Sequence, residues 1–188
     1  MSATSSSKMG PSDYLAWERA QAGKHQYVGG EIFAMAGGSP RHNFLSGRIW
    51  SRFDAAPCRP LSSDQKVHIP RSGNFLYPDC TVVCGPVQLY ARASDVIENP
   101  RVVVEVLSQS TEHHDRGDKW QDYRSIESLT DYVLVSQRMA HIEHFARESE
   151  GSWKYRDAGA GGRLELTTGA VLVVDEIYAG AFDLPGDE

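Results

Sequence analysis

One six-residue segment, 102–107, constrains the fold more than any other part of the chain. It reads Val-Val-Val-Glu-Val-Leu, and a strand that is apolar on both faces is typically buried on both faces. Glu105 is the exception within it, because a buried carboxylate is costly unless it is paired or binds a metal. The segment therefore predicts a layered core. It leaves open whether Glu105 belongs to a structural ion pair or to a metal site.

The rest of the pattern predicts helices packed on a central sheet. Gly29-Gly30 is a two-residue hairpin signal, and Ser39-Pro40 is typical of a helix start. This order of elements is neither a regular βα alternation nor all-β, so we expect an α+β or mixed α/β domain. We expect helices at 12–21, from 39–40 through 53, and from 112 or 115 to 127. We expect strands in the hairpin 26–35, at 65–70 (half-buried), 75–84, 102–107, 132–136, 142–147, 153–157, 164–166 and 171–174.

The chain of 188 residues is long enough for one domain, which we expect over residues 11–188, after a disordered leader at residues 1–10. Its longest apolar run, at 32–36, has five residues, whereas a membrane span needs roughly 20. We therefore expect no contact with a membrane. The net charge of −6 argues against a general nucleic-acid coat protein, although it allows an enzyme with a locally basic groove. The sequence is compatible with a homodimer.

The three cysteines, Cys58, Cys80 and Cys84, are odd in number and lack CxxC spacing. Such a set argues against a disulfide framework and against a standard zinc site. We therefore expect reduced cysteines and a cytoplasmic protein.

Asp79 is the second candidate acid. It follows Pro78 and enters an apolar segment at 80–84, so it is expected at the start of a buried strand. Taken alone, a turn-forming role explains the Pro-Asp pair equally well. Two strand-borne acids in one sheet can lie side by side, however, and a divalent cation relieves the repulsion between them. Asp79 and Glu105 are therefore a candidate metal-binding pair.

Three further residues have both a functional and a plain structural interpretation. Lys119 shares a predicted helix face with apolar residues, so its amine either reaches a nearby anion or extends to solvent. Glu31 follows the hairpin turn, where an exposed glutamate is the simpler interpretation. His42 lies near the predicted helix start, as a cap or surface group or as a residue facing the site.

Several segments together, in their order and spacing, resemble one family. The resemblance covers nearly the whole chain, from about Tyr14 to Tyr178. The segments are Tyr27-Val28-Gly29-Gly30-Glu31, Ser39-Pro40-Arg41-His42-Asn43, Tyr77-Pro78-Asp79, Val104-Glu105-Val106-Leu107-Ser108, Asp115 with Lys119 and Tyr123, and the run from Glu127 to Val135. They look like the Uma-two family of restriction-endonuclease-like proteins, which belongs to the PD-(D/E)xK nuclease superfamily.

The resemblance implies a mixed sheet flanked by helices and hydrolysis of DNA phosphodiester bonds. It implies Asp79 and Glu105 as ligands of Mg²⁺ or Mn²⁺, with Asp79, Glu105 and Lys119 as catalytic residues. The superfamily lysine would stand two residues after the second acid, where this chain has Leu107. Lys119 matches the helix lysine that replaces it in the family, and Glu31 matches a further acid. The alternative is a catalytically weak nucleic-acid-binding or regulatory module on the same scaffold.

Overall fold

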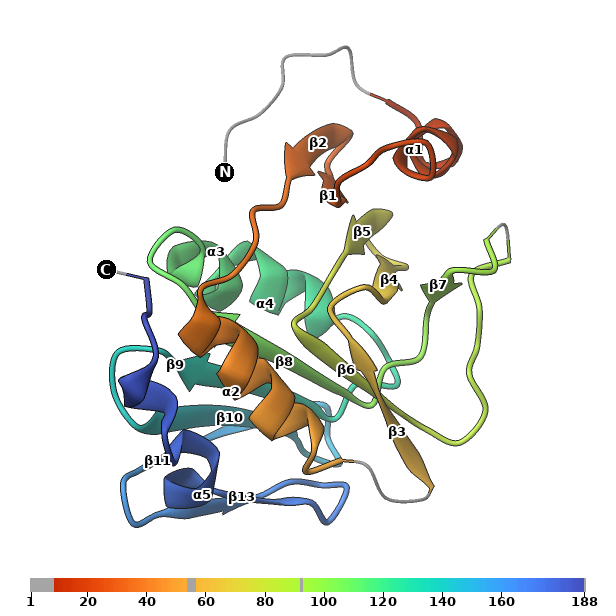
Figure 1. Cartoon of the computed structure of the whole chain (residues 1–188). Helices are drawn as coiled ribbons and strands as arrows, with labels where there is room; N and C mark the ends of the chain where they lie inside the picture. Colours follow the sequence, from red (N-terminus) through yellow and green to blue (C-terminus); the bar gives the residue numbers. More distant parts are fainter. Residues whose placement is uncertain (1–8, 54–56, 92, 188) are drawn as a thin grey trace.

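The computed structural model describes residues 9–53, 57–91 and 93–187, and Figure 1 labels its elements. A central six-stranded sheet has the order β11-β10-β9-β8-β6-β3. It is mixed, as predicted, because β8 and β9 are parallel while the other neighbours are antiparallel. Its strands are β3 (Cys58–Ser62), β6 (Cys80–Cys84), β8 (Val102–Leu107), β9 (Asp131–Ser136), β10 (His141–Arg147) and β11 (Trp153–Gly159).

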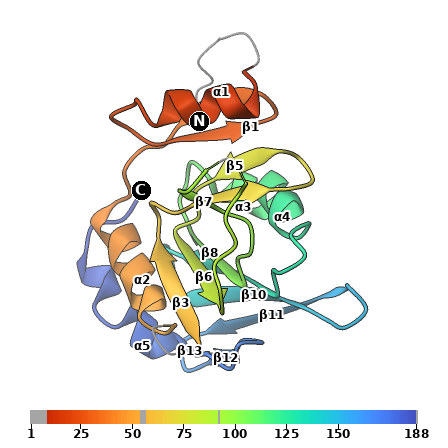
Figure 2. The ribbon, with the colours of Figure 1, turned by 90° about the vertical axis from the view of Figure 1, so that its right-hand side faces the viewer.

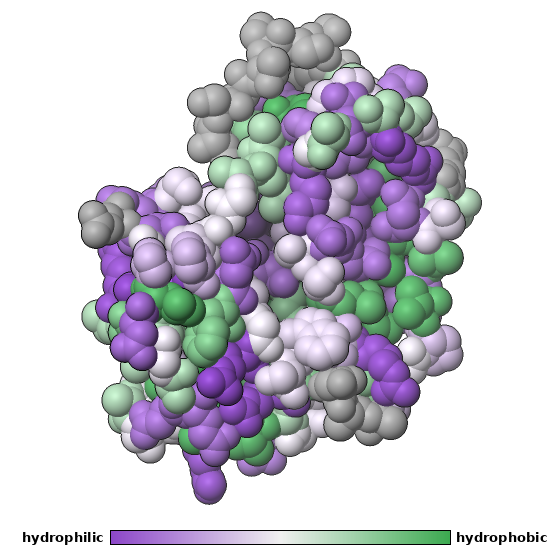
Figure 3. Space-filling model, in the orientation of Figure 1, coloured by the Kyte–Doolittle hydropathy of each residue, from purple (hydrophilic) through white to green (hydrophobic). Residues whose placement is uncertain are grey.

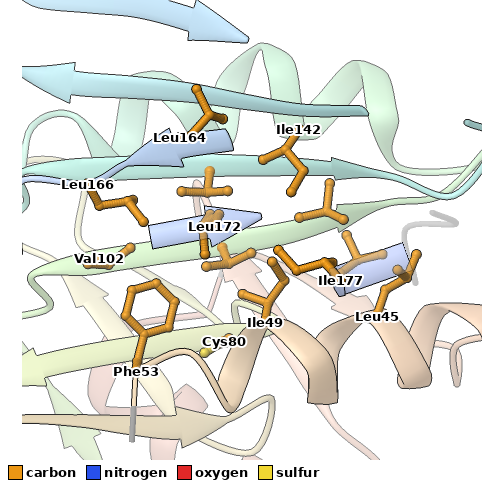
Figure 4. Packing of buried hydrophobic residues seen from close by; sticks show 14 of the residues in the cluster. Leu45, Ile49, Phe53, Cys80, Val102, Ile142, Leu164, Leu166, Leu172 and Ile177 are labelled. Carbon is orange, nitrogen blue, oxygen red and sulfur yellow. The ribbon is translucent and has the colours of Figure 1, made fainter. Parts of the chain in front are cut away.

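Helices cover both faces of this sheet. On one face Val102 of β8 packs in a cluster with Ile49 of α2 (Figure 4), and on the other Val103 packs with Tyr123 of α4. Successive residues of a strand point to opposite faces, so Glu105 points to the α4 side. The covering elements are α2 (Pro40–Trp50), α5 (Val174–Tyr178) and the 3-10 helix η1 (Ala181–Asp183) on one face, and α3 (Glu112–Arg116) and α4 (Asp118–Tyr123) on the other.

A second sheet, in the order β2-β1-β5-β4-β7, lies with helix α1 above the central sheet in Figure 2. Gly29 and Gly30 form the predicted hairpin turn, with φ of 60° and 92°. Figure 3 shows the surface hollowed between this upper part and the part carrying α2, with mostly hydrophilic residues around the hollow. The elements are α1 (Pro11–Glu18), β1 (His25–Val28), β2 (Glu31–Ala34), β4 (Lys66–Ile69), β5 (Asn74–Leu76) and β7 (Val96–Ile97), and a separate pair comprises β12 (Arg163–Glu165) and β13 (Val171–Val173).

The predicted single strand 75–84 is wrong, because the chain divides there between the two sheets. β5 belongs to the small sheet and β6 to the central sheet, with Pro78 between them. Proline has no N–H to donate to a strand ladder, which favours a break at this position. The break leaves Asp79 immediately before β6, at the junction of the two sheets.

Two other predicted elements also need correction. The strand predicted at 65–70 is fully buried rather than half-buried, because aromatic rings cover its polar side chains, such as Lys66 beside Tyr14 and Tyr77. The helix predicted from 112 or 115 to 127 is two short helices that end at Tyr123. They separate at Gly117, whose φ of −107° and ψ of −99° lie outside the helical region.

The expectation of reduced cysteines is also wrong for two of the three. Strand β3, which the sequence pattern did not reveal, pairs with β6 so that Cys58 stands opposite Cys84, and the two form a disulfide. Cys80 is free and buried. A pairing across 26 residues depends on strand register, which cysteine spacing does not contain. Pro60 fits β3 because β3 is an edge strand of the central sheet.

Residues 1–8 of the predicted leader lie outside the described residues. Met9 is part of the folded body, because its N–H donates to Gly30 and its carbonyl accepts from the Tyr27 hydroxyl. No helix within the described ranges is long and apolar enough to cross a membrane.

Candidate active site

The junction between the sheets brings Asp79 and Glu105 together. Strands β6 and β8 are antiparallel, with Cys80 opposite Val104. One further step in this register places Asp79 opposite Glu105, and residues directly opposite each other in an antiparallel pair project from the same face. The backbone N–H of Val106 donates to Asp79 Oδ2 at 2.7 Å, which ties the acid to the neighbouring strand. The two predicted metal-binding acids are therefore neighbours.

Each of these carboxylates has one engaged oxygen and one open oxygen. Asp79 Oδ2 accepts the Val106 N–H, and Glu105 Oε1 accepts both Lys119 Nζ at 3.1 Å and the Tyr123 hydroxyl at 2.9 Å. Among the described residues, no hydrogen bond or ion pair engages Asp79 Oδ1 or Glu105 Oε2. Side-chain exposure is 16% for Asp79 but 3% for Glu105, so Asp79 is the member nearer to solvent.

Lys119 is buried against the acids rather than extended to solvent. Its amine lies 3.1 Å from Glu105 Oε1 and 2.8 Å from Asp115 Oδ1, and 6% of its side chain is exposed. The helix-face prediction is therefore correct in placing Lys119 with apolar residues. Its solvent-reaching alternative is wrong, because two buried carboxylates hold the amine inside.

Asp115 and Tyr123 complete the surroundings of Lys119. Both belong to the segments that resemble the family, but neither was predicted as a site residue. Asp115 has 2% of its side chain exposed and stands four residues before Lys119, at the spacing of facing helical side chains. Gly117 interrupts the helix between them, yet the pair still meets. The i,i+4 spacing of acid and lysine was the sequence signal that could have identified Asp115. Tyr123 gave no such signal, because a tyrosine on an apolar helix face indicates burial of its ring and does not identify a partner for its hydroxyl.

The cluster has more negative than positive groups. Burial, only partly offset by the charge of Lys119, raises the pKa of Glu105 to about 8, and the charges of Asp115 and Asp79 add to the rise. Burial by itself would lower the pKa of Lys119, but Glu105 and Asp115 raise it above its usual range. The single ammonium thus stays charged among three carboxyl groups. The excess negative charge favours uptake of a proton or a cation.

His42 faces the cluster from α2. Ser39 caps this helix, accepting the His42 N–H, and His42 Nε2 lies 3.2 Å from Asp79 Oδ2. Burial lowers the pKa of His42, but the hydrogen bond to Asp79 and the charges of Asp79 and Glu105 outweigh it, so the pKa is raised. Gly38 makes room for the ring, because a Cβ there would lie 2.6 Å from His42 Nδ1. His42 is therefore both a residue of the helix start and a neighbour of the acids.

Glu31 does not join the cluster through any polar contact. It is exposed at the start of β2, and its side chain makes no hydrogen bond or ion pair with another described residue. The exposed-hairpin interpretation of Glu31 agrees with this placement. Leu107, which stands where the superfamily motif has its lysine, is buried at the end of β8.

The donor set suits a hard divalent cation that keeps water ligands. No group of three or more histidine, cysteine, aspartate or glutamate side chains in the described parts of the chain could hold a metal ion. Mg²⁺, however, is commonly held by one or two carboxylates, with waters and substrate phosphate oxygens completing its octahedron. The open oxygens of Asp79 and Glu105 can supply the two carboxylate ligands that such a site needs.

The amino-acid sequence is similar to those of known proteins. Residues 11–175 match the Uma2 family, described as "Putative restriction endonuclease". Among curated proteins, "Uncharacterized protein slr1290" of Synechocystis sp. is 39% identical over 92% of this chain and 93% of its own length. A second protein of that organism, "Uncharacterized protein sll1609", is 28% identical over 75% of this chain and 82% of its own length.

A solved structure supports the fold independently of sequence. The crystal structure of "a putative nuclease belonging to DUF820" from Anabaena variabilis aligns with a TM-score of 0.73, over 92% of this chain and 99% of the other. The sequence identity is 10%, so the likeness concerns the fold alone. The family match over residues 11–175 and the relative that is 39% identical over 92% of this chain show that this chain belongs to the Uma2 family of restriction-endonuclease-like proteins.

Proposed function

We propose that this protein hydrolyses DNA phosphodiester bonds in a reaction that depends on Mg²⁺ or Mn²⁺ and takes place at Asp79 and Glu105. The observation that carries the proposal is the position of Asp79, immediately before β6, beside Glu105 of β8, with one oxygen of each acid left open. The membership of a family described as restriction endonucleases supports the same reaction class.

The residues around the pair have distinct roles in this proposal. Asp79 and Glu105 would hold the cation, which polarises the phosphate and lowers the pKa of a bound water. Lys119, fixed by Glu105 and Asp115, places a positive charge beside the acids, where it offsets charge on the transition-state oxygens.

His42 and Val106 fix the orientation of Asp79 within the pair. Both reach the same oxygen, Oδ2, so the carboxylate keeps Oδ1 turned away from them and open. Preorganisation of this kind matters because a displaced catalytic group loses much of its effect. His42 is therefore a positioning residue in this proposal rather than a group that touches the substrate.

Plasmid cleavage tests the proposal directly. Supercoiled and single-stranded circular DNA are incubated with wild type, Asp79→Asn or Glu105→Gln, with Mg²⁺, Mn²⁺ or a chelator. We expect cleavage only with metal, and a loss of about a hundredfold or more in both variants. Glu165→Gln, which changes an exposed acid on β12, is the matched control and should cleave like wild type.

Thermal melting tests the metal site without requiring the correct DNA. Each cation should stabilise the wild type, by about 2.7 kcal/mol at a hundredfold excess over its dissociation constant, and should have little effect on Glu105→Gln. A wild type that neither cleaves DNA nor responds to either cation would refute the proposal. DNA binding without cleavage would instead support the regulatory-module alternative.

A further inference from the structure

A pocket that is separate from the candidate active site lies beside α4. It has a volume of about 570 Å³, and α4, the β10–β11 hairpin and the turn before β5 form its walls. Figure 2 shows this hairpin projecting from the molecule on the side where α4 lies. Its lining includes Arg71, Arg124 and Arg147, which define what we call the arginine pocket, and no aspartate or glutamate. None of the lining residues belongs to the Asp79–Glu105 cluster.

Two of the three arginines lack a structural partner. Arg147 is held in place, because its guanidinium donates to the carbonyls of Arg124 and Ile126, both at 2.7 Å. Arg71 and Arg124 are exposed, and within the described part of the chain their side chains form no hydrogen bond or ion pair. In a chain of net charge −6, three guanidinium groups around one acid-free pocket favour an anionic ligand.

Aromatic rings form the rest of the wall. The ring of Trp153 lies 4.8 Å from that of Trp120, and the Arg147 guanidinium lies 4.7 Å from the Trp153 ring. Phe145 and Tyr155 also line the pocket, and Tyr155 is 50% exposed. Arg147 and Trp153 stand opposite each other on neighbouring strands, and their packing stabilises the hairpin. This structural role does not explain why further aromatic rings face the pocket.

We propose that the arginine pocket binds a nucleotide unit of DNA, with an unpaired base against the aromatic wall and its phosphate on Arg71 and Arg124. Bases stack on aromatic side chains with little regard to sequence, and arginine recognises phosphate through paired N–H donors. The pocket volume is in the range of small-ligand pockets, so the pocket is too small to hold a DNA duplex. The nucleotide is either part of a single strand or free in solution, and both sources share this chemistry.

Binding can be measured separately from the proposed hydrolysis, because the pocket and the acid pair share no residue. Each probe is titrated into the Asp79→Asn variant in chelator, where no cleavage is expected. A lack of binding would therefore contradict the arginine-pocket proposal without bearing on the proposed hydrolysis. The probes are a 5′-phosphorylated oligothymidylate labelled at its 3′ end, thymidine monophosphate as competitor, and inorganic phosphate as a second competitor. Fluorescence anisotropy reports the dissociation constant at several salt concentrations.

Arg71→Gln and Arg124→Gln should each weaken oligothymidylate binding about fivefold, and the double variant at least twentyfold. The slope of log K against log salt should become shallower by about 0.7 per arginine that contacts a phosphate. The matched control is Arg156→Gln, an exposed arginine of β11 outside the pocket lining, which should change affinity less than twofold. Trp153→Leu should weaken binding as well, provided that its circular dichroism shows a folded protein.

The competitors distinguish the two sources. Competition by thymidine monophosphate at an affinity similar to that of the oligonucleotide supports a free nucleotide, and competition only by strands supports single-stranded DNA. The proposal is overturned if the double arginine variant binds as well as Arg156→Gln. It is also overturned if inorganic phosphate competes as well as the nucleotide, because the aromatic wall then contributes nothing.

Discussion

Lys119 should contribute more to the folded state than either carboxylate it contacts, because it is the one ammonium shared by two buried acids. Removing one partner of a buried ion pair costs about 3–5 kcal/mol, since the other charge is left uncompensated. Lys119→Met keeps the length of the stem but leaves Glu105 and Asp115 without their cation, so we expect a loss in that range. Glu105→Gln leaves Lys119 paired with Asp115, and Tyr123 can still donate to the glutamine oxygen. It should cost about 1 kcal/mol or less.

The difference between the two variants should depend on pH. Without Lys119, the folded-state pKa of Glu105 rises further above its unfolded value of about 4.3. A carboxyl group with a raised folded-state pKa binds its proton more tightly in the folded protein, so stability falls as the pH rises through this interval. Measured against Glu105→Gln, which has no titrating group at position 105, the deficit of Lys119→Met should therefore be largest near pH 8 and should shrink as the pH falls toward 5.

Urea denaturation in chelator, followed by far-ultraviolet circular dichroism at pH 8 and pH 5, measures these free energies. The matched control is Lys24→Met, because Lys24 pairs with Asp64 at 3.0 Å on the surface, with side-chain exposures of 37% and 82%. That exposed pair should contribute no more than about 1 kcal/mol. The reasoning is refuted if Glu105→Gln costs as much as Lys119→Met, or if Lys119→Met costs no more than Lys24→Met.

Three further predictions concern residues around the site and the core. Burial of Asp131 raises its pKa, but its hydrogen bonds with His144 and with Thr167, including the Thr167 N–H, outweigh burial and lower the pKa. Its contribution is thus present above about pH 4 and lost as the pH falls through the lowered pKa, so Asp131→Asn should cost about 3 kcal/mol in urea denaturation at pH 7 and much less at pH 3. Cys58→Ser should lower the free energy of unfolding by about 3 kcal/mol in oxidising buffer and should match wild type in reducing buffer, and equal stability in both buffers would contradict the disulfide. Gly38→Ala should push the His42 ring away from its carboxylate partner and lower the pKa of His42 measured by NMR titration, whereas an unchanged pKa would show that the ring does not rest on this glycine.

The sequence by itself determined the local elements and the most unusual residue of the core. The positive φ angles at Gly29-Gly30 and the cap at Ser39 follow from neighbouring residues, so they can be read from short patterns. The apolar run around Glu105 likewise required burial on both faces, and both faces carry helices. These features depend on interactions within a few residues, which is the information that a sequence pattern contains.

Only the tertiary structure decided which of these residues meet. The register of β6 against β8 sets Asp79 beside Glu105, and the packing of α4 against β8 brings Lys119 to Glu105. The placement of His42 likewise depends on packing of α2 against the central sheet. Such contacts join residues far apart in the chain, and their energies depend on burial that exists only after the sheets and helices have assembled. A pattern along the chain can therefore identify the acids, whereas the charge balance around them is a property of the fold.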